Sequence, residues 1–166
     1  MISSLIDRVD EAEAKIVRKF VQQYPVKVGE LATALGLKVT RTPLPPKISG
    51  LIKPSEEAKA KFEIRVNKYE VPERQRFTVA HEIAHYLLHR KEIGLGVIDS
   101  IMYRSNLTSR KETEANRLAA DIVMPTQAIN RELEKFGGRR TEEVAEEMAT
   151  IFKVSVPAMK VRLGVT

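Results

Sequence analysis

The stretch RFTVAHEIAHYLLH holds the residues with the clearest capacity for chemistry, His81, Glu82 and His85. Residues four apart on a helix share a face, with Cβ atoms about 5–6 Å apart, so two imidazoles at this spacing can bind one metal ion. Zinc binds neutral histidine nitrogens at roughly 2.0–2.1 Å, and a catalytic zinc site has three protein ligands and a water. Glu82 is rotated about 100° from His81 around the helix, which suits a base for that water better than a ligand. The pattern H-E-x-x-H therefore predicts a metal-dependent hydrolytic site.

An alternative interpretation is that these histidines are ordinary polar residues on a helix surface. By residue usage, H-E-x-x-H occurs by chance in on the order of one in several hundred chains of this size. Here it lies inside residues 71–90, the strongest helical pattern of the sequence, where Pro72 suits a first turn and the apolar residues form a wide face. We therefore favour the metal site over a helix surface.

The third ligand of such a site must come from another part of the chain. His89 is eight residues from His81, about 12 Å along the helix axis, so one ion cannot bind both, and we expect His89 at the rim of the helix end. The chain has three histidines and no cysteine. An aspartate or a glutamate is therefore expected to complete the ligand set.

The predicted helix over residues 109–125 offers such a carboxylate. Glu112 and Asn116 share one face with three alanines, whose small side chains would let this helix approach the HEIAH helix closely. We predict Glu112 as the third metal ligand and Asn116 as the residue that holds a histidine's second ring nitrogen. Glu114 points to the opposite side, toward solvent or a neighbouring arginine. A second role for Glu112 stays open, because Ser109-x-x-Glu112 also fits a capping box that binds the carboxylate to a backbone amide.

Further helices and strands must hold these two helices in place. Residues 4–23 follow the helical period, and residues 28–36 form a short helix that ends at Gly36. The segments LKVTRTPLP, ISGLIKP and KFEIRVN are strand candidates that predict a small antiparallel sheet. A loop of roughly twenty residues, which includes the strand candidate IMYR, follows the HEIAH helix. This order of elements predicts an α+β fold.

Residues 126–166 contain a pair of helices with the spacing of a helix-turn-helix unit. EEVAEEMATIFKVSVPAMKVRLG reads as a helix, a turn at FKVS and a second helix capped by Ser155. DNA binding is one interpretation, but the first helix carries four glutamates and the second only Lys160 and Arg162, which is few for phosphate contacts. We therefore favour a helical cap on the catalytic part over direct nucleic-acid binding. Docking of a protein substrate is a third interpretation.

Composition narrows the class of protein. A chain of 166 residues suits one domain with a small appended subdomain. The absence of cysteine excludes disulfides and thiolate ligands, and it favours a reducing, cytoplasmic setting. The N-terminus lacks an apolar signal segment, and no apolar run is long enough to span a membrane, so no membrane partner is expected. The net charge of +6 is spread along the chain and is typical of a solvated surface.

Two blocks of the sequence resemble the ImmA/IrrE family of zinc-dependent metallopeptidases. They are PERQRFTVAHEIAHYLLH and ETEANRLAADIVMP, and the resemblance extends over residues 12–126. H-E-x-x-H alone occurs in many zinc peptidases, whereas its combination with the second block is specific. Leu118 departs from the family pattern, which usually has an aromatic residue at this packing position.

For the site, the resemblance implies Zn²⁺ held by His81, His85 and Glu112 in a gluzincin-type set, with Glu82 as the general base. A tetrahedral intermediate also needs a donor for its oxyanion, and we predict Tyr103, in the loop before the Glu112 helix. The alternatives for this donor are Arg104 and Tyr86.

For the whole chain, we expect a zincin-like metallopeptidase domain in residues 1–125, as the resemblance implies, and a helical subdomain in residues 126–166, as the helical pattern there predicts. It implies a regulatory endopeptidase that cleaves a separately encoded, DNA-binding repressor of the helix-turn-helix type, in mobile-element induction or a stress response. Two other classes stay open. One is a regulator that binds and displaces its repressor without cleavage and keeps a structural metal, and the other is a DNA-binding regulator that uses the C-terminal helices.

Overall fold

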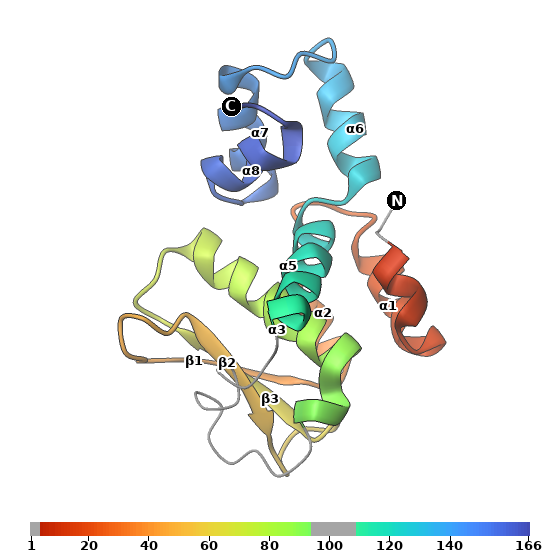
Figure 1. The fold of residues 1–166 in the computed structure, drawn as a ribbon, viewed down its shortest axis with the longest axis vertical. Helices are drawn as coiled ribbons and strands as arrows, with labels where there is room; N and C mark the ends of the chain where they lie inside the picture. The colour runs from red at the N-terminus through yellow and green to blue at the C-terminus, as the bar shows by residue number, and fades with distance from the viewer. Residues whose placement is uncertain (1–3, 94–108) are drawn as a thin grey trace.

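A computed structural model describes residues 4–93 and 109–166 and has a small sheet beside two central helices (Figure 1). The α+β class predicted from the sequence is confirmed. In chain order, the elements are η1 (Ser4–Arg8), α1 (Glu11–Phe20), α2 (Val28–Ala34), β1 (Lys38–Thr42), β2 (Gly50–Pro54), β3 (Phe62–Asn67), α3 (Pro72–Ile93), α5 (Ser109–Val123), α6 (Thr126–Lys135), α7 (Glu142–Phe152) and α8 (Val156–Leu163).

The N-terminal segment forms two elements, so the prediction of one helix over residues 4–23 was wrong. The 3₁₀ helix η1 ends at Arg8, and Asp10 then leaves helical geometry with φ −48° and ψ 134°. Its carboxylate accepts a hydrogen bond from the backbone N–H of Glu13 at 3.3 Å, and this bond caps α1. Asp10 therefore starts a new helix inside a pattern that otherwise reads as continuous. The short helix predicted before Gly36 is confirmed, and Gly36 has a φ of 84° that favours glycine.

The three predicted strands form one mixed sheet in the order β1-β3-β2. β2 and β3 pair antiparallel, whereas β1 and β3 pair parallel. The antiparallel sheet expected from the sequence is therefore correct for one pair and wrong for the other. The reason is the strand order: β2 runs opposite to β1, and β3 returns between them, so β3 runs parallel to β1.

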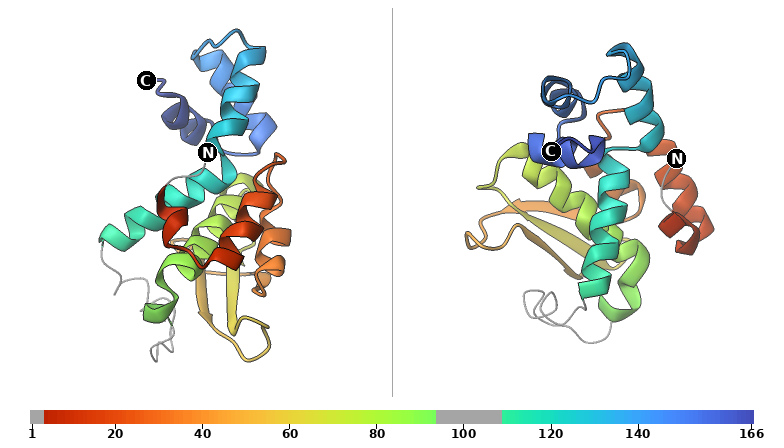
Figure 2. Two further views of the ribbon diagram at one scale, coloured as in Figure 1. Left: turned by 90° about the vertical axis from the view of Figure 1, so that its right-hand side faces the viewer. Right: turned by 45° about the horizontal axis from the view of Figure 1, so that its top comes forward.

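Helix α3 packs against the sheet at short range (Figure 2). Gly50, at the start of β2, permits this contact, because a Cβ there would lie 2.4 Å from Cγ2 of Thr78 on α3 and 2.7 Å from the carbonyl oxygen of Arg65. Ile64 of β3 and Ile83 of α3 are fully buried in the resulting core. The sheet thus fixes the position of the helix that carries both candidate ligand histidines.

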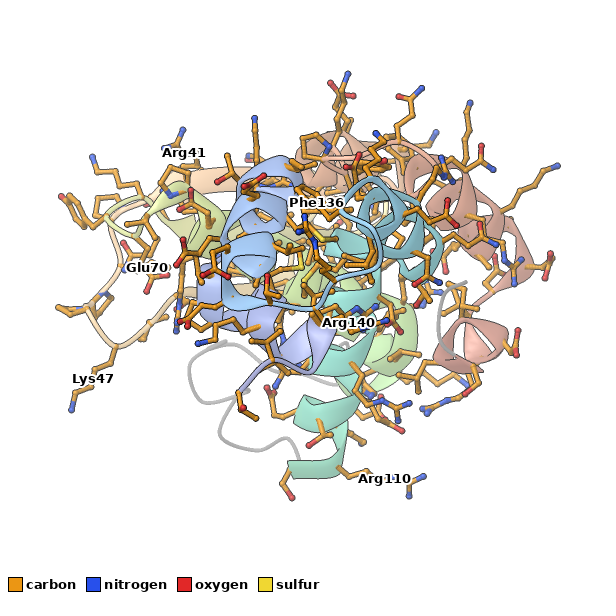
Figure 3. The ribbon with its side chains drawn as sticks, turned by 90° about the horizontal axis from the view of Figure 1, so that it is seen from above. Arg41, Lys47, Glu70, Arg110, Phe136 and Arg140 are labelled. Carbon is orange, nitrogen blue, oxygen red and sulfur yellow. The ribbon has the colours of Figure 1, made fainter. Side chains whose placement is uncertain are left out.

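Helix α5 packs along α3, as the small residues of its sequence predicted (Figure 1). Ala115 and Ala119 are fully buried, and their short side chains allow a close approach. Leu118 is also fully buried, which agrees with a packing position. At the start of α5, Arg110 extends into solvent with 86% of its side chain exposed (Figure 3).

The C-terminal helices α6, α7 and α8 lie beyond the end of α5 (Figure 1). The Ser155 hydroxyl accepts a hydrogen bond from the first turn of α8, which confirms the predicted cap. Arg76 of α3 donates to the carbonyl oxygen of Lys153 at 3.2 Å, and Arg162 of α8 contacts Asp121 of α5 at 2.7 Å. These bonds tie α7 and α8 to the two central helices. Within the described ranges, no helix combines the length and apolarity needed to cross a membrane.

Candidate metal centre

His81 and His85 lie one turn apart on α3, and Glu112 of α5 faces both of them. Nε2 of His81 is 3.3 Å from Oε2 of Glu112, and Nε2 of His85 is 3.1 Å from Oε1. One ligand atom from each residue lies within 4.8 Å of the others. Ligands at roughly 2.0–2.1 Å from a tetrahedral zinc would lie roughly 3.4 Å from one another, so this spacing suits a single ion. The structure therefore brings the three predicted ligands together.

The orientation of Glu112 separates the two roles that its sequence allowed. Its carboxylate points across the helix pair at the imidazoles, with 28% of the side chain exposed. The two imidazole rings meet edge to face, with centroids 4.6 Å apart. This placement favours the ligand role over a capping box, because a cap would direct the carboxylate back to the start of its own helix.

The donors of this cluster are chemically suited to a cation. Nε2 of His81 and Oε1 of Glu112 are buried, and the polar contacts described for these two atoms lie within the cluster itself. Burial raises the pKa of the Glu112 carboxyl, but the imidazoles of His81 and His85 outweigh burial and hold that pKa well below its usual range. Two imidazole nitrogens and an ionised carboxylate are a set that zinc prefers, so these residues fit Zn²⁺.

The other predicted site residues have different surroundings. Glu82, the predicted base, is fully buried next to His81 on α3. Asn116 is exposed on α5 and lines a groove beside Glu112, and the second ring nitrogen of His85 contacts another residue instead. Tyr103, the predicted oxyanion donor, lies outside the described residues, as does its alternative Arg104.

Tyr86, the remaining alternative for the oxyanion donor, packs in the core. Its ring meets the Phe62 ring edge-on at 5.7 Å between centroids, and the Arg90 guanidinium lies 4.4 Å from its centroid. Burial, followed by a hydrogen bond to Glu13, raises the pKa of Tyr86 to about 12. These contacts place Tyr86 in the packing between α3 and α1.

Three residues beside the centre were missed or misplaced from the sequence. His89 is buried, so its expected place at the helix rim was wrong, and its Nδ1 lies 3.0 Å from Nδ1 of His85. Glu114 is mostly buried, so the expectation that it faces solvent was wrong, whereas the alternative of a pair with Arg110 is confirmed at 3.8 Å. The contacts of its carboxylate with His89 and Arg8 were not predicted. The i,i+4 spacing of His85 and His89 was a usable signal. Nothing local in the sequence indicated Arg8, which is more than a hundred residues from Glu114.

Local charges act on this second cluster. The hydrogen bond from Arg8, and then that from His89, lower the pKa of Glu114 to about 2. Burial lowers the pKa of His89 against the opposing effect of Glu114. The cluster therefore contains an ionised carboxylate between a guanidinium and an imidazole.

Two of the candidate ligands, His81 and Glu112, open onto a groove of about 1210 Å³. His81, Glu112 and Phe77 line it from α3 and α5, and residues 153–158, the α7–α8 turn and the first turn of α8, line it from the C-terminal helices. Two of the four exposed large hydrophobic residues of the described ranges lie on this groove, Val71 at 63% and Val156 at 37% exposure. A channel of this size with apolar side chains on both walls can accept an extended polypeptide segment.

Comparison with known proteins gives relatives that share part of the chain. The chain is 41% identical over 85 residues to the radiation response metalloprotease IrrE of Deinococcus radiodurans. The aligned segment is 50% of this chain and 26% of that protein. It is 39% identical over 84 residues to the protein of the same name from Deinococcus deserti, covering 49% of this chain and 30% of that one. The matched segments thus span less than a third of the length of either relative.

A solved structure and a family comparison extend the match over most of the chain. A Mycobacterium tuberculosis transcriptional regulator shares the fold with a TM-score of 0.59 at 17% identity, over 96% of this chain and 48% of that one. The family described as the IrrE N-terminal-like domain matches residues 32–164, which include the HEIAH helix, α5 and the C-terminal helices. The resemblance found in the HEIAH and ETEAN blocks is confirmed, and the chain belongs to this ImmA/IrrE family.

Proposed function

We propose that this chain is a zinc-dependent endopeptidase of regulatory type with a gluzincin-like site. The observation that carries the proposal is the convergence of His81, His85 and Glu112, two of which, His81 and Glu112, line a groove that can hold a polypeptide. The family membership supports the same reaction class. We also propose that residues 1–125 form a zincin-like metallopeptidase domain and that residues 126–166 form a helical subdomain that closes one side of its groove.

The roles of the residues follow from their chemistry. His81, His85 and Glu112 would hold Zn²⁺, which would polarise a peptide carbonyl and lower the pKa of a water. Glu82, adjacent to the ligand His81, would accept the proton of the attacking water and pass it to the leaving amine. Tyr103 would donate to the oxyanion of the tetrahedral intermediate.

The substrate class we propose is a protein, specifically a DNA-binding repressor of the helix-turn-helix type supplied by a separate chain. Direct nucleic-acid binding by α8 has little support, because its basic side chains are engaged within the molecule. Lys160 contacts Glu142 at 3.1 Å, and Arg162 contacts Asp121 and the carbonyl oxygen of Met124. Phosphate binding would compete with these bonds.

Metal content tests the ligand set directly. We expect near-stoichiometric zinc in the purified wild-type chain and in Thr113→Ala, an exposed neighbour of Glu112 on α5, and its loss in Glu112→Ala. Elemental mass spectrometry measures zinc per chain, and circular dichroism checks that each variant is folded. A folded wild-type chain that takes up no supplied zinc would refute the site.

New protein N-termini distinguish the peptidase from its alternative, a regulator that displaces its partner without cleavage. Cells that express the wild type should contain cleavage products that are absent with Glu82→Gln, because this variant keeps the metal ligands and loses the proton acceptor. N-terminal mass spectrometry compares the two. Identical effects of both proteins on the same partner would establish the non-cleaving regulator.

A further inference from the structure

A chain of three hydrogen-bonding contacts leads from the candidate ligand His85 to the N-terminal segment. Nδ1 of His85 lies 3.0 Å from Nδ1 of His89, and Nε2 of His89 lies 3.0 Å from Oε1 of Glu114. Arg8 of η1 donates from Nη1 to Oε2 of Glu114 at 2.5 Å. His85 and His89 are almost fully buried, and Glu114 is mostly so, which shields these contacts from water.

The positions of the protons in this chain follow from its far end. The Glu114 carboxylate, paired with Arg8, only accepts hydrogen bonds, so Nε2 of His89 must carry the proton that faces it. A neutral imidazole has one N–H, which leaves Nδ1 of His89 as an acceptor. Nδ1 of His85 must then donate to it, and Nε2 of His85 retains its lone pair.

The same order is required from the metal side. A histidine that binds a metal through Nε2 must hold its proton on Nδ1 and donate it to a neighbour. His85 has such a neighbour in His89, and its Nε2 is the atom that faces Glu112 at 3.1 Å. Nδ1 of His81, in contrast, is buried and has no hydrogen-bond partner in the described ranges. Of the two candidate ligand imidazoles, His85 is therefore the one whose second ring nitrogen is held by a described hydrogen bond.

We infer that Glu114, acting through His89, is a positioning residue that holds the His85 imidazole in the tautomer and orientation needed to bind a metal ion. This inference rests on the metal site proposed above. Neither His89 nor Glu114 would touch the metal or the substrate. Their contribution is to remove the cost of rearranging protons and rotating a buried ring when the ion binds.

Glu114→Gln tests this inference with little change in shape. Arg8 would attract the amide oxygen, so the amide nitrogen would donate to Nε2 of His89. Both imidazoles would then take the opposite tautomer, with the proton of His85 on Nε2, the atom that should bind the metal. Glu92→Gln is the matched control: Glu92 also joins α3 to α5, through Lys111 at 2.9 Å, and it acts on His89 through its charge alone, without the hydrogen bond that Glu114 makes.

Two measurements on the purified full chain decide the question. Competition with a chromogenic chelator should show zinc affinity about 10–100-fold weaker in Glu114→Gln and unchanged in Glu92→Gln. In the metal-free wild type at pH 8, long-range ¹⁵N–¹H NMR should show the proton of His85 on Nδ1 and that of His89 on Nε2. The NMR measurement needs no variant and holds even if Glu114→Gln does not fold.

The outcomes separate this inference from the proposed function. Unchanged zinc affinity in folded Glu114→Gln, or a proton on Nε2 of His85 in the metal-free wild type, would overturn the positioning role while the metal site stands. A wild-type chain that binds no zinc would refute the metal site itself. The zinc titration of the wild type is enough to show this outcome, without any variant.

Discussion

The Nε atom of Arg76 donates to the backbone carbonyl oxygen of Lys153 at 3.2 Å, and this bond joins the HEIAH helix to the turn between α7 and α8. A second bond at the other end of α8, from Arg162 to Asp121, joins it to α5. Because the α7–α8 turn is one wall of the groove, these two arginines set its distance from the candidate metal centre. The C-terminal helices are thereby part of the site's architecture.

Arg76→Ala should loosen this wall. We expect a loss of about 1–2 kcal/mol in the free energy of unfolding, since the substitution leaves the Lys153 carbonyl without its charged donor. Hydrogen exchange should become faster in residues 153–158 than in α3. Arg74→Ala is the control. Arg74 is exposed, and the contacts described for its side chain are with Ser49 and Glu70, not with the C-terminal helices. Equal exchange in both variants would show that the Arg76 bond does not hold the turn.

Val156→Asp should impair substrate binding without affecting zinc. Val156 is exposed on the groove wall, and a carboxylate there would remove apolar contact and place a charge beside the bound segment. We expect the yield of wild-type-specific cleavage products to fall roughly ten-fold or more. Val161→Asp lies on the same helix, is 82% exposed and is not on the groove, so its yield should be unchanged. If the two variants behave alike, the groove is not the binding surface.

The two central helices and the convergence of the candidate ligands were predictable because their signals are local. The spacing of His81 and His85, the alanine face of α5 and the Ser155 cap each depend on residues within a few positions. The position of Glu112 against the histidines followed from these patterns together with the shortage of other ligands.

The errors for the sheet, Glu114 and His89 share a physical cause, which is contact between segments that are distant in sequence, whereas the break at Asp10 is local. Periodicity cannot indicate that β3 inserts between β1 and β2, because strand order depends on the whole sheet. Glu114 appeared solvent-facing because its partner Arg8 lies at the other end of the chain. His89 is buried and its Nε2 contacts Glu114 of α5, a partner that the HEIAH helix alone does not reveal.

Two glycine substitutions should have opposite effects on stability. Gly50→Ala would force a Cβ to within 2.4 Å of Thr78 Cγ2 and 2.7 Å of the Arg65 carbonyl oxygen, so we expect a loss of about 1–3 kcal/mol. Gly29→Ala, inside α2, meets no atom within 4 Å and should stabilise the chain by about 0.5–1 kcal/mol through helix propensity. Urea denaturation measures both. A neutral Gly50→Ala would mean that β2 and α3 can separate without cost.

Acid should weaken the contact between the N-terminal helices and α6 through Glu132. Its carboxylate accepts hydrogen bonds from Tyr24 and Lys135, both at 2.8 Å, and the Lys135 bond in particular lowers the pKa of Glu132 below its ordinary value of 4.5. A carboxyl with a lowered folded-state pKa stabilises the fold above about pH 4.5 and loses that contribution as pH falls toward the folded-state value. Glu132→Gln should therefore be less stable by about 1–2 kcal/mol at pH 7, and its unfolding free energy should fall less than that of the wild type between pH 5 and pH 3. Glu134→Gln is the control, because Glu134 is exposed on the same helix and its loss should leave the wild-type pH dependence unchanged. Denaturation curves at each pH give the unfolding free energy of the three proteins. If that free energy falls equally with pH in all three, Glu132 is not the source of the acid sensitivity.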